Sequence, residues 1–509
     1  NMSVDFSKNA TERPEPCKEQ PRGCFPYCCE FFHLDSYKAN IYRKSGFFLI
    51  CSLIHKGVTT GDGSAYLCWH RFLTPDTLPG TALPRICVSS LRYGDALFPV
   101  SISHSKPSNF LLFRAITFLN HTMPDFTDNG ASNFIKYGND YYATSETNYI
   151  SKIDPVTLET LEKYLPVNLA SCHPHYDKEG NAYNFGTSIA TKGKTKYVLF
   201  KVPAVSDKGK KGPALKNVEV ICSVPCRSLL MPSYYHSFGM TDNYIIFVEM
   251  PFKLDILKMA TAYMRGVSWA SCLKFCPEEN TLIHLVDRKT GKEVETKYYT
   301  GAMVLYHHVN AFEDDGHVVF DVIAYTDNSL YDMFYLSNLK EKSQFDEKRF
   351  SKPNYKRFAL PIHADKVSCG GNMVKLKYTT ASAVKEKEGK FMCQAEVLCE
   401  GFELPRINYD INGKRHQFVY GNHVAKFDTE TKKMVYWGED KCLPSEPVFI
   451  PRPNGESEDD GVVLTSVINS NPGQSSFILI LDGKTFKEVA RAYVNTELNK
   501  DMHGFFIPH

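Results

Sequence analysis

Histidine is the residue type that offers this chain the most chemistry. The sequence contains seventeen histidines, and an imidazole serves as a metal ligand or as an acid or base near neutral pH. Four of them stand beside small or stiff neighbours at the edges of predicted strands: His173 in CHPHYD, His236 in PSYYHSFG, His307 in LYHHVNAFEDDG and His503 in MHGFF. Helical metal motifs place ligands three or four residues apart, whereas an axial site in a propeller takes each ligand from a different blade. Residue type alone does not select these four, because a histidine is more often an ordinary core or surface residue.

Cysteine offers a second possible metal chemistry. Two pairs have the spacing Cys-x3-Cys, Cys222 with Cys226 and Cys272 with Cys276, but neither has a second pair or a histidine at zinc-finger spacing. The sixteen cysteines are spread along a long chain, which indicates reduced thiols rather than a disulfide framework. The sequence therefore argues against structural zinc.

Composition excludes several classes of protein. The chain is 43% hydrophobic and 23% charged, with a formal net charge of only +2, so we expect a globular protein that does not bind nucleic acid. Its apolar runs, such as residues 47–54, are far shorter than the roughly 20 residues that span a bilayer. Residues 1–22 are polar and lack the apolar core of a secretory signal. We therefore expect a cytoplasmic protein.

From residue 141 onward, short β-rich runs alternate with turn residues. The runs include 196–202, 218–224, 244–249, 318–325, 462–467 and 476–481, and turn sequences such as EDDG at 313–316 and 458–461 separate them. Many short strands without intervening helices predict an all-β fold, and the length favours a propeller that forms one domain over residues 1–509. No internal repeat is visible, so the pattern leaves the number of blades open.

One segment reads as a helix. Residues Leu254 to Leu273, LDILKMATAYMRGVSWASCL, place apolar side chains at mixed spacings of three and four, with Lys258 and Arg265 between them. Two interpretations are open. The helix either packs on the core or lies in a membrane interface, where Met, Tyr and Trp beside cations are typical.

From residue 118 to the C-terminus the chain resembles the animal carotenoid cleavage oxygenases. The likeness is carried by NHTMPDFTDN (120–129), YYATSETNYISKIDPVTLETLEK (141–163), HPHYDKEGNAYNFGTS (173–188), SLLMPSYYHSFGMTDNYIIFVE (228–249), YHHVNAFEDDGHVVFDVIAY (306–325), FELPRINY (402–409), EPVFIPRPNGESEDDGVVL (446–464) and FILILDGKTFKEVARA (477–492). A match of this length over so many motifs is highly specific.

The resemblance implies a seven-bladed β-propeller with a helical dome over the active-site face. It also implies ferrous iron on the propeller axis, held by His173, His236, His307 and His503, while the adjacent His175 and His308 are not ligands. Glutamates that orient three of the imidazoles map to Glu146, Glu403 and Glu458, and aromatic rings near the reacting bond map to Tyr235 and Tyr325.

Residues 24–113 do not resemble the family, although they should supply the first blade. The Arg-Asn-Gly-Pro and Phe-Asp-Gly segments that the family carries there are not recognisable. Either this stretch has diverged, or it derives from a mistranslated or mispredicted exon. The clustered Cys24, Cys28 and Cys29 favour the second interpretation.

The resemblance implies a dioxygenase that cleaves β-carotene or a related provitamin A carotenoid at its central double bond to give retinal. Three alternatives stay open: eccentric or apocarotenal cleavage, isomerohydrolysis of a retinoid, and carotenoid binding without catalysis. The partners implied are a carotenoid, dioxygen and a membrane or lipid carrier, because the substrate is nearly insoluble in water. The segment Pro251 to Leu273 is the expected membrane contact.

Overall fold

The computed structural model describes residues 132–507 apart from short gaps, together with the backbone of three strands nearer the N-terminus. The gaps are 147–148, 156–157, 165–168, 190–194, 205–213, 260–268, 334–349, 363–368, 387–388, 495–497 and 499–500. The early strands are β1 (Phe47–Cys51), β2 (His55–Thr59) and β3 (Ala65–Trp69). Apart from these strands, residues 24–113 lie outside the described part of the chain, so the two interpretations of that stretch stay open.

The described strands form almost entirely antiparallel sheets, in which strands that follow one another in the chain pair side by side. The first sheets contain β4 (Asn133–Tyr137), β5 (Asp140–Thr144), β6 (Ile150–Ile153) and β7 (Thr160–Tyr164), and then β8 (Leu169–Ala170), β9 (His175–Tyr176), β10 (Ala182–Ser188), β11 (Lys196–Val202) and β12 (Glu219–Pro225). The next sheet contains β13 (Gly239–Met240), β14 (Tyr244–Glu249), β17 (Thr281–Asp287), β18 (Tyr298–Thr300), β23 (Phe391–Gln394) and β22 (Ser382–Lys385), with β18 and β23 parallel.

The remaining sheets follow in chain order around the molecule. They contain β19 (Val304–Asp314), β20 (His317–Tyr325), β21 (Asn354–Pro361) and β24 (Glu396–Glu400); β25 (Phe418–Gly421), β26 (Ala425–Asp428) and β27 (Lys433–Tyr436); and β28 (Cys442–Pro444), β29 (Val448–Pro451), β30 (Gly461–Asn469), β31 (Ser476–Asp482) and β32 (Glu488–Val494). The last strand, β33 (His503–Ile507), pairs with β1.

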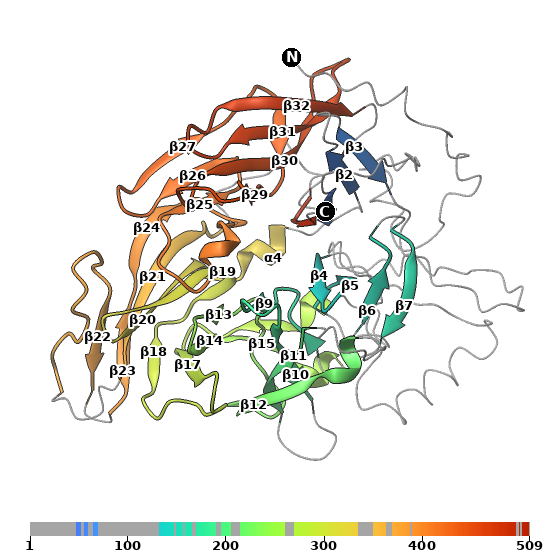
Figure 1. Ribbon diagram of the computed structural model, residues 1–509. Coiled ribbons are helices and arrows are strands. Elements are labelled where there is room, and N and C mark those ends of the chain that lie inside the picture. Colours follow the sequence, from blue (N-terminus) through green and yellow to red (C-terminus); the bar gives the residue numbers. More distant parts are fainter. Residues whose placement is uncertain are drawn as a thin grey trace, which may run out of the picture.

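The sheets are arranged around a centre as in a β-propeller (Figure 1). This arrangement confirms the all-β propeller that the strand pattern predicts. Six blades are found among the described strands, not the seven that the resemblance implies. The last strand, β33, belongs to a further sheet whose other strands, β1 to β3, are described by their backbone alone.

The hairpin of β19 and β20 illustrates how sequence dictates the blades. Seven of the nine residues of β20 are apolar, the exceptions being His317 and Asp321, and all nine side chains are buried, as expected of a strand covered on both faces. The turn between the strands places Asp315 (φ 42°) and Gly316 (φ 73°) in the left-handed region, which glycine and aspartate tolerate better than other residues. The acidic turn EDDG is therefore a true hairpin turn.

The predicted helix over Leu254 to Leu273 is wrong at both ends. Leu254 and Leu273 pair with each other as the last residue of β15 (Phe252–Leu254) and the first of β16 (Leu273–Phe275). Between them, residues 256–259 are helical, Trp269–Cys272 forms a 3-10 turn, and 260–268 lie outside the described residues. Hydrogen bonds between these two backbone segments outweigh the helix preference that the spacing of apolar residues indicates.

A helical dome is not found in the described part of the chain. The helical elements there are α4 (Ser329–Met333), the turn at 256–259 and three 3-10 turns at Ala214–Asn217, Trp269–Cys272 and Tyr409–Ile411.

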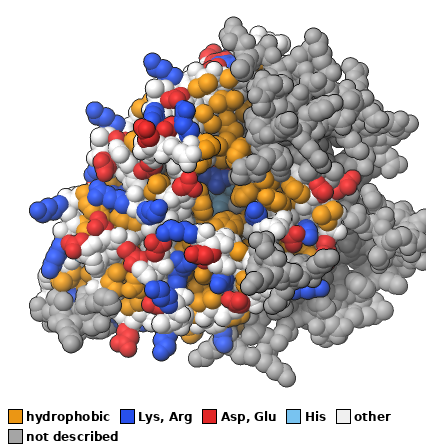
Figure 2. Space-filling view, viewed as in Figure 1, with side chains coloured by type: hydrophobic (Ala, Val, Ile, Leu, Met, Phe, Trp, Pro, Cys, Tyr) orange, Lys and Arg blue, Asp and Glu red, His pale blue; other side chains and the backbone are white. Residues whose placement is uncertain are grey.

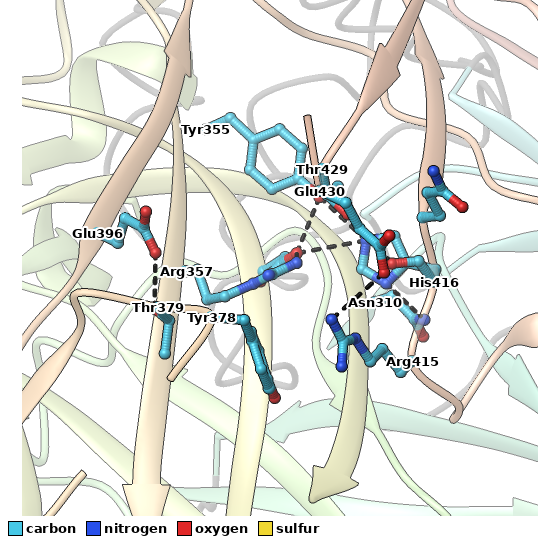
Figure 3. A network of polar contacts seen from close by, with 12 residues as sticks. Asn310, Tyr355, Arg357, Tyr378, Thr379, Glu396, Arg415, His416, Thr429 and Glu430 are labelled. Carbon is cyan, nitrogen blue, oxygen red and sulfur yellow. Dashed lines mark hydrogen bonds and ion pairs between the residues drawn. The ribbon is translucent and has the colours of Figure 1, made fainter. Parts of the chain in front are cut away.

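A buried ionic network joins two neighbouring blades (Figure 3). Asp321 of β20 is fully buried, and its two carboxylate oxygens accept hydrogen bonds from Arg357 Nε at 2.8 Å and Nη2 at 2.7 Å. The Tyr355 hydroxyl donates to the same carboxylate at 2.9 Å, and His416, just before β25, lies 3.3 Å from it. Asn310 of β19 donates to the carbonyl of Lys414 at 2.8 Å. The network therefore fixes the segment that leads into the next blade.

Candidate metal centre

Four histidines from distant parts of the chain meet at one point. His173, His236, His307 and His503 each offer a ring nitrogen, and these four nitrogens lie within 4.8 Å of one another. His173 Nε2 lies 2.8 Å from His236 Nε2, and the ring centroids of His173 and His503 are 4.5 Å apart. Convergence of four imidazoles from four sheets is the arrangement that a propeller axis allows and a local motif does not.

Three of the four histidines lie next to a strand or at its first residue, and the fourth lies inside a strand. His173 lies between β8 and β9, His236 lies just before β13, and His503 is the first residue of β33. His307 lies within β19, between two shifts of register at Leu305/His307 and at His308/Asn310. Such irregularities re-aim a side chain next to a functional site. They turn His307 toward the other three imidazoles.

The far ring nitrogens of three of these histidines contact glutamates. Glu146 lies against His236 Nδ1, Glu403 Oε2 is 2.7 Å from His307 Nδ1, and Glu446 Oε1 is 2.9 Å from His503 Nδ1. A carboxylate that accepts the Nδ1 proton leaves the lone pair of Nε2 free for a metal and increases its basicity. His307 Nε2 and His503 Nε2 are buried and have no protein partner. The donor set therefore fits a metal ion.

The electrostatics favour a neutral imidazole at His173 and His503. Burial, together with the three neighbouring imidazoles, holds the pKa of His173 well below its usual range. Burial lowers the pKa of His503 to about 4 although Glu446 opposes this. For His307, burial also acts to lower the pKa, but Glu403 outweighs it and the pKa is raised. A metal would displace that proton, since only the deprotonated nitrogen is a ligand.

The prediction that Glu458 orients a histidine is contradicted. Both Glu458 oxygens accept hydrogen bonds from the backbone of Gln417 and Phe418, at 2.8 to 3.1 Å, so this side chain caps the start of β25. The glutamate on His503 is Glu446, which the sequence analysis missed. Glu446 lies two residues before β29, which begins with buried residues, and a carboxylate in such a place needs a buried partner, whereas an acidic turn is usually solvated. That contrast could have identified it.

The two predicted tyrosines have different surroundings. The Tyr325 hydroxyl donates to Glu403 Oε1 at 2.8 Å, so this side chain contacts the glutamate that lies against His307. Tyr235 instead packs into a blade core against Phe247, and its hydroxyl accepts from Thr187 Oγ1 at 3.2 Å. Its neighbour Tyr234 donates to Glu146 at 2.9 Å. Alternate residues of an extended segment share a face, so the ring on the face of His236 is Tyr234, not Tyr235.

The histidines adjacent to ligands lie outside the four-histidine cluster. His175 Nε2 donates to the carbonyl of Phe238 at 2.8 Å, and the His308 ring stacks on Phe320 at a centroid distance of 5.9 Å. Each of these two rings is held by a residue of a neighbouring segment.

Comparison with solved structures places this architecture among known folds. An apocarotenoid oxygenase from Synechocystis superposes with a TM-score of 0.64 over 92% of this chain and 93% of its own, at 16% identity. A likeness at this identity concerns the fold. It agrees with the propeller arrangement described above.

Comparison of sequences extends over the whole chain. The family model described as retinal pigment epithelial membrane protein matches residues 22–508. The β,β-carotene 15,15′-dioxygenase of Gallus gallus is 51% identical over 100% of this chain and 98% of its own length, and that of Homo sapiens is 47% identical over 99% and 95%. The matches include the stretch 24–113, where the motifs could not be recognised by inspection. The chain therefore belongs to the carotenoid oxygenase family that includes the retinal pigment epithelial membrane proteins.

Proposed function

We propose that this protein is a non-haem iron dioxygenase that cleaves the central double bond of β-carotene, or of a related provitamin A carotenoid, to give retinal. The observation that carries this proposal is the four-imidazole centre in a chain that is 51% identical over its full length to a β,β-carotene 15,15′-dioxygenase. The reaction needs no protein nucleophile, because dioxygen supplies both new oxygen atoms.

Iron is proposed as the metal on the chemistry of the donor set and on family membership. Imidazole nitrogens suit iron, copper or zinc, so the ligands alone do not decide between them. His173, His236, His307 and His503 would hold the ion, and no carboxylate is among the four grouped ligands. When bound, ferrous iron would activate dioxygen for addition to the polyene.

The chain's own residues orient the ligands and favour positive charge on the substrate. Glu146, Glu403 and Glu446 hold the Nδ1 protons of three imidazoles, which directs each Nε2 inward. Burial and the adjacent Glu403 raise the pKa of Tyr325 far above its usual range, so its hydroxyl remains a donor to Glu403. Electron-rich ring faces would stabilise positive charge that develops along a polyene.

An aromatic cluster adjoins the metal centre and fits an apolar substrate. The ring of Tyr306 lies 5.4 Å from that of Tyr325, 5.7 Å from Tyr331 and 6.2 Å from His236, measured between centroids. Figure 2 shows hydrophobic side chains bordering a hollow near the centre of one face, with Lys or Arg and His atoms visible inside it. We propose that the polyene enters a site of this apolar character.

We further propose that the sheet of β33 with β1, β2 and β3 is a seventh blade. Its strands β33 and β1 contact β4 of the first described blade, and β33 also contacts β29 of the last. In this position the sheet would close the ring and bring His503 to the other ligands.

Exchanging the carboxylates for amides should distinguish the glutamates that support ligands from the one that does not. Glu403→Gln and Glu446→Gln should each weaken metal binding and activity about 10- to 100-fold, since an amide no longer fixes the imidazole proton. Glu458→Gln should leave metal affinity unchanged, because Glu458 contacts only backbone near β25. Metal affinity measured by competition with a chelator checks this. If Glu458→Gln were as damaging as Glu446→Gln, the assignment of Glu446 would fail.

Product analysis tests the reaction itself. The purified protein, supplied with Fe(II), oxygen and β-carotene, should form retinal as the only cleavage product. A longer apocarotenal would indicate eccentric cleavage, and a retinol isomer formed from a retinyl ester would indicate isomerohydrolysis. Bound carotenoid without any product would indicate a binding protein. Each of these results would overturn central cleavage.

We also propose a cytoplasmic enzyme that takes its substrate from a membrane surface or lipid carrier. Within the described residues, no helix is long and apolar enough to span a bilayer. Leu229, Leu230 and Leu257 are 53%, 41% and 61% exposed, and the backbone hydrogen bond from Ile256 to Leu230 holds their segments together. Exposed leucines beside a cation such as Lys258 suit a membrane interface. Met264, also expected there, lies outside the described residues.

Leu257→Glu should weaken binding to liposomes and slow cleavage of liposome-borne carotenoid, because a charge at this position opposes insertion into the acyl boundary. Cleavage of substrate dissolved in detergent should stay near normal. Leu443→Glu is the matched control, as Leu443 is 52% exposed on β28. Equal losses of Leu257→Glu activity in both assays would show that the leucine supports the fold rather than the membrane contact.

A further inference from the structure

The short segment from Glu403 to Arg406 contacts two different ligand-bearing strands of the metal centre. Glu403 lies against His307, and Arg406, three residues later, reaches the C-terminal ligand strand. The backbone of Arg406 pairs with Tyr420 of β25 through two hydrogen bonds of 2.7 Å. These bonds anchor the segment to a blade, so the side chain of Arg406 extends from a fixed backbone position.

Arg406 and Glu446 hold the peptide that follows His503 from two sides. The amide of Gly504 donates to Glu446 Oε2 at 2.9 Å, and its carbonyl accepts from Arg406 Nη2. Arg406 Nη2 also lies 3.1 Å from Glu446 Oε2. Since the other oxygen of Glu446 contacts His503 Nδ1, one guanidinium and one carboxylate fix both the strand and its imidazole.

The charge of Arg406 is also needed to keep Glu446 in place. The Glu446 side chain is only 3% exposed, and burying an ionised carboxylate is costly unless it is paired. Without the guanidinium, the carboxylate would keep its contacts with the His503 imidazole and the Gly504 amide but lose its paired charge, and it would gain by moving toward water.

We propose that Arg406 is a positioning residue of the metal centre, which acts through Glu446 and Gly504 to present His503 to the metal. This proposal rests on the four-histidine centre proposed above. Arg406 itself touches neither metal nor substrate in this role. A purely structural role, such as bracing β25, would instead affect all four ligands alike.

A double-mutant cycle with Co(II) separates these roles. The full-length chain is stripped of metal, and its Co(II) affinity is measured by competition with a chelator. Arg406→Gln should weaken Co(II) binding about 10- to 100-fold, as expected for loss of a group that supports a ligand. Arg406→Lys should lose less, since a lysine keeps the charge but not the planar fork. In a His503→Ala background, Arg406→Gln should cause no further loss.

Arg415→Gln is the matched control, because the Arg415 guanidinium is 45% exposed and pairs with an exposed Glu430 at 3.3 Å. It should bind Co(II) like the wild type. Wild-type affinity in Arg406→Gln, or an equal loss with and without His503, would overturn the proposal. If thermal melting shows that Arg406→Gln does not fold, the cycle is run with Arg406→Lys and the same criterion applies. Failure of the wild type to bind Co(II) would refute the centre itself, before any Arg406 variant is compared.

Discussion

Replacement of any one of His173, His236, His307 and His503 by alanine is expected to abolish carotenoid cleavage and to lower the iron content of the purified protein. Each variant removes one of four nitrogens that lie within 4.8 Å of one another. Three imidazoles then remain, and a site with fewer ligands should hold the metal more weakly. Iron per chain and retinal formed from β-carotene are the two quantities to measure.

His317→Gln serves as the control for these four variants. His317 is also buried, but its ring nitrogens contact the carbonyls of Asp315 and Met373, away from the cluster. This variant should keep its iron. Full iron occupancy and normal turnover in any one of the four alanine variants would remove that histidine from the ligand set.

Asp321→Asn is expected to lower the free energy of unfolding by about 3 to 5 kcal/mol, the usual cost of leaving one member of a buried ion pair alone. Asp321 is fully buried, and an amide cannot accept both hydrogen bonds from Arg357. The melting temperature and denaturant midpoint of the apoprotein check the loss, provided that unfolding is reversible.

The pH dependence of this loss follows from the pKa of Asp321. Burial acts to raise that pKa, but Arg357 and His416 outweigh it and hold the pKa below the ordinary value of 3.8. A carboxyl with a lowered folded pKa stabilises the fold fully above its unfolded pKa, and the contribution fades as the pH falls through the folded value. The difference between wild type and Asp321→Asn should therefore be constant near neutral pH and shrink below about pH 4.

Glu430→Gln is the control for Asp321→Asn. The pair of Glu430 with Arg415 lies in the same view (Figure 3) but is solvent-exposed, so its loss should cost less than about 1 kcal/mol. If Asp321→Asn cost no more than Glu430→Gln, the buried network would not contribute to stability as proposed.

The four histidines could be named from the sequence only through motifs. Their neighbours in CHPHYD, PSYYHSFG, LYHHVNAFEDDG and MHGFF match the family, whereas their spacing along the chain carries no signal. The structure brings them together because each lies on or beside an inner strand of a different sheet. His175 and His308 show that residue type alone is not enough, since these imidazoles stand beside ligands in the sequence but lie outside the cluster.

The wrong predictions for Glu458, Tyr235 and residues 254–273 share a physical cause. Glu458 and Glu446 both lie near strand ends, and only the docking of β33 against the segment of Glu446 selects one of them. Tyr234 and Tyr235 are neighbours, and the direction of the chain before β13 decides which one faces Glu146. The ends of the expected helix over 254–273 became paired strands because two distant backbone segments satisfied each other's hydrogen bonds.

By itself, the sequence determined the fold class and the kind of chemistry. Alternating short strands and turn residues are local signals, so an all-β propeller and its hairpins could be predicted from them. The family motifs identified the four histidines for the same reason, because a motif is a short run of adjacent residues. Which carboxylate supports each imidazole, which tyrosine faces the centre, and how Arg406 reaches the last ligand were decided only by the tertiary structure. These are contacts between residues up to 98 positions apart, and their partners are chosen by how the blades pack around one axis rather than by any neighbour in the chain.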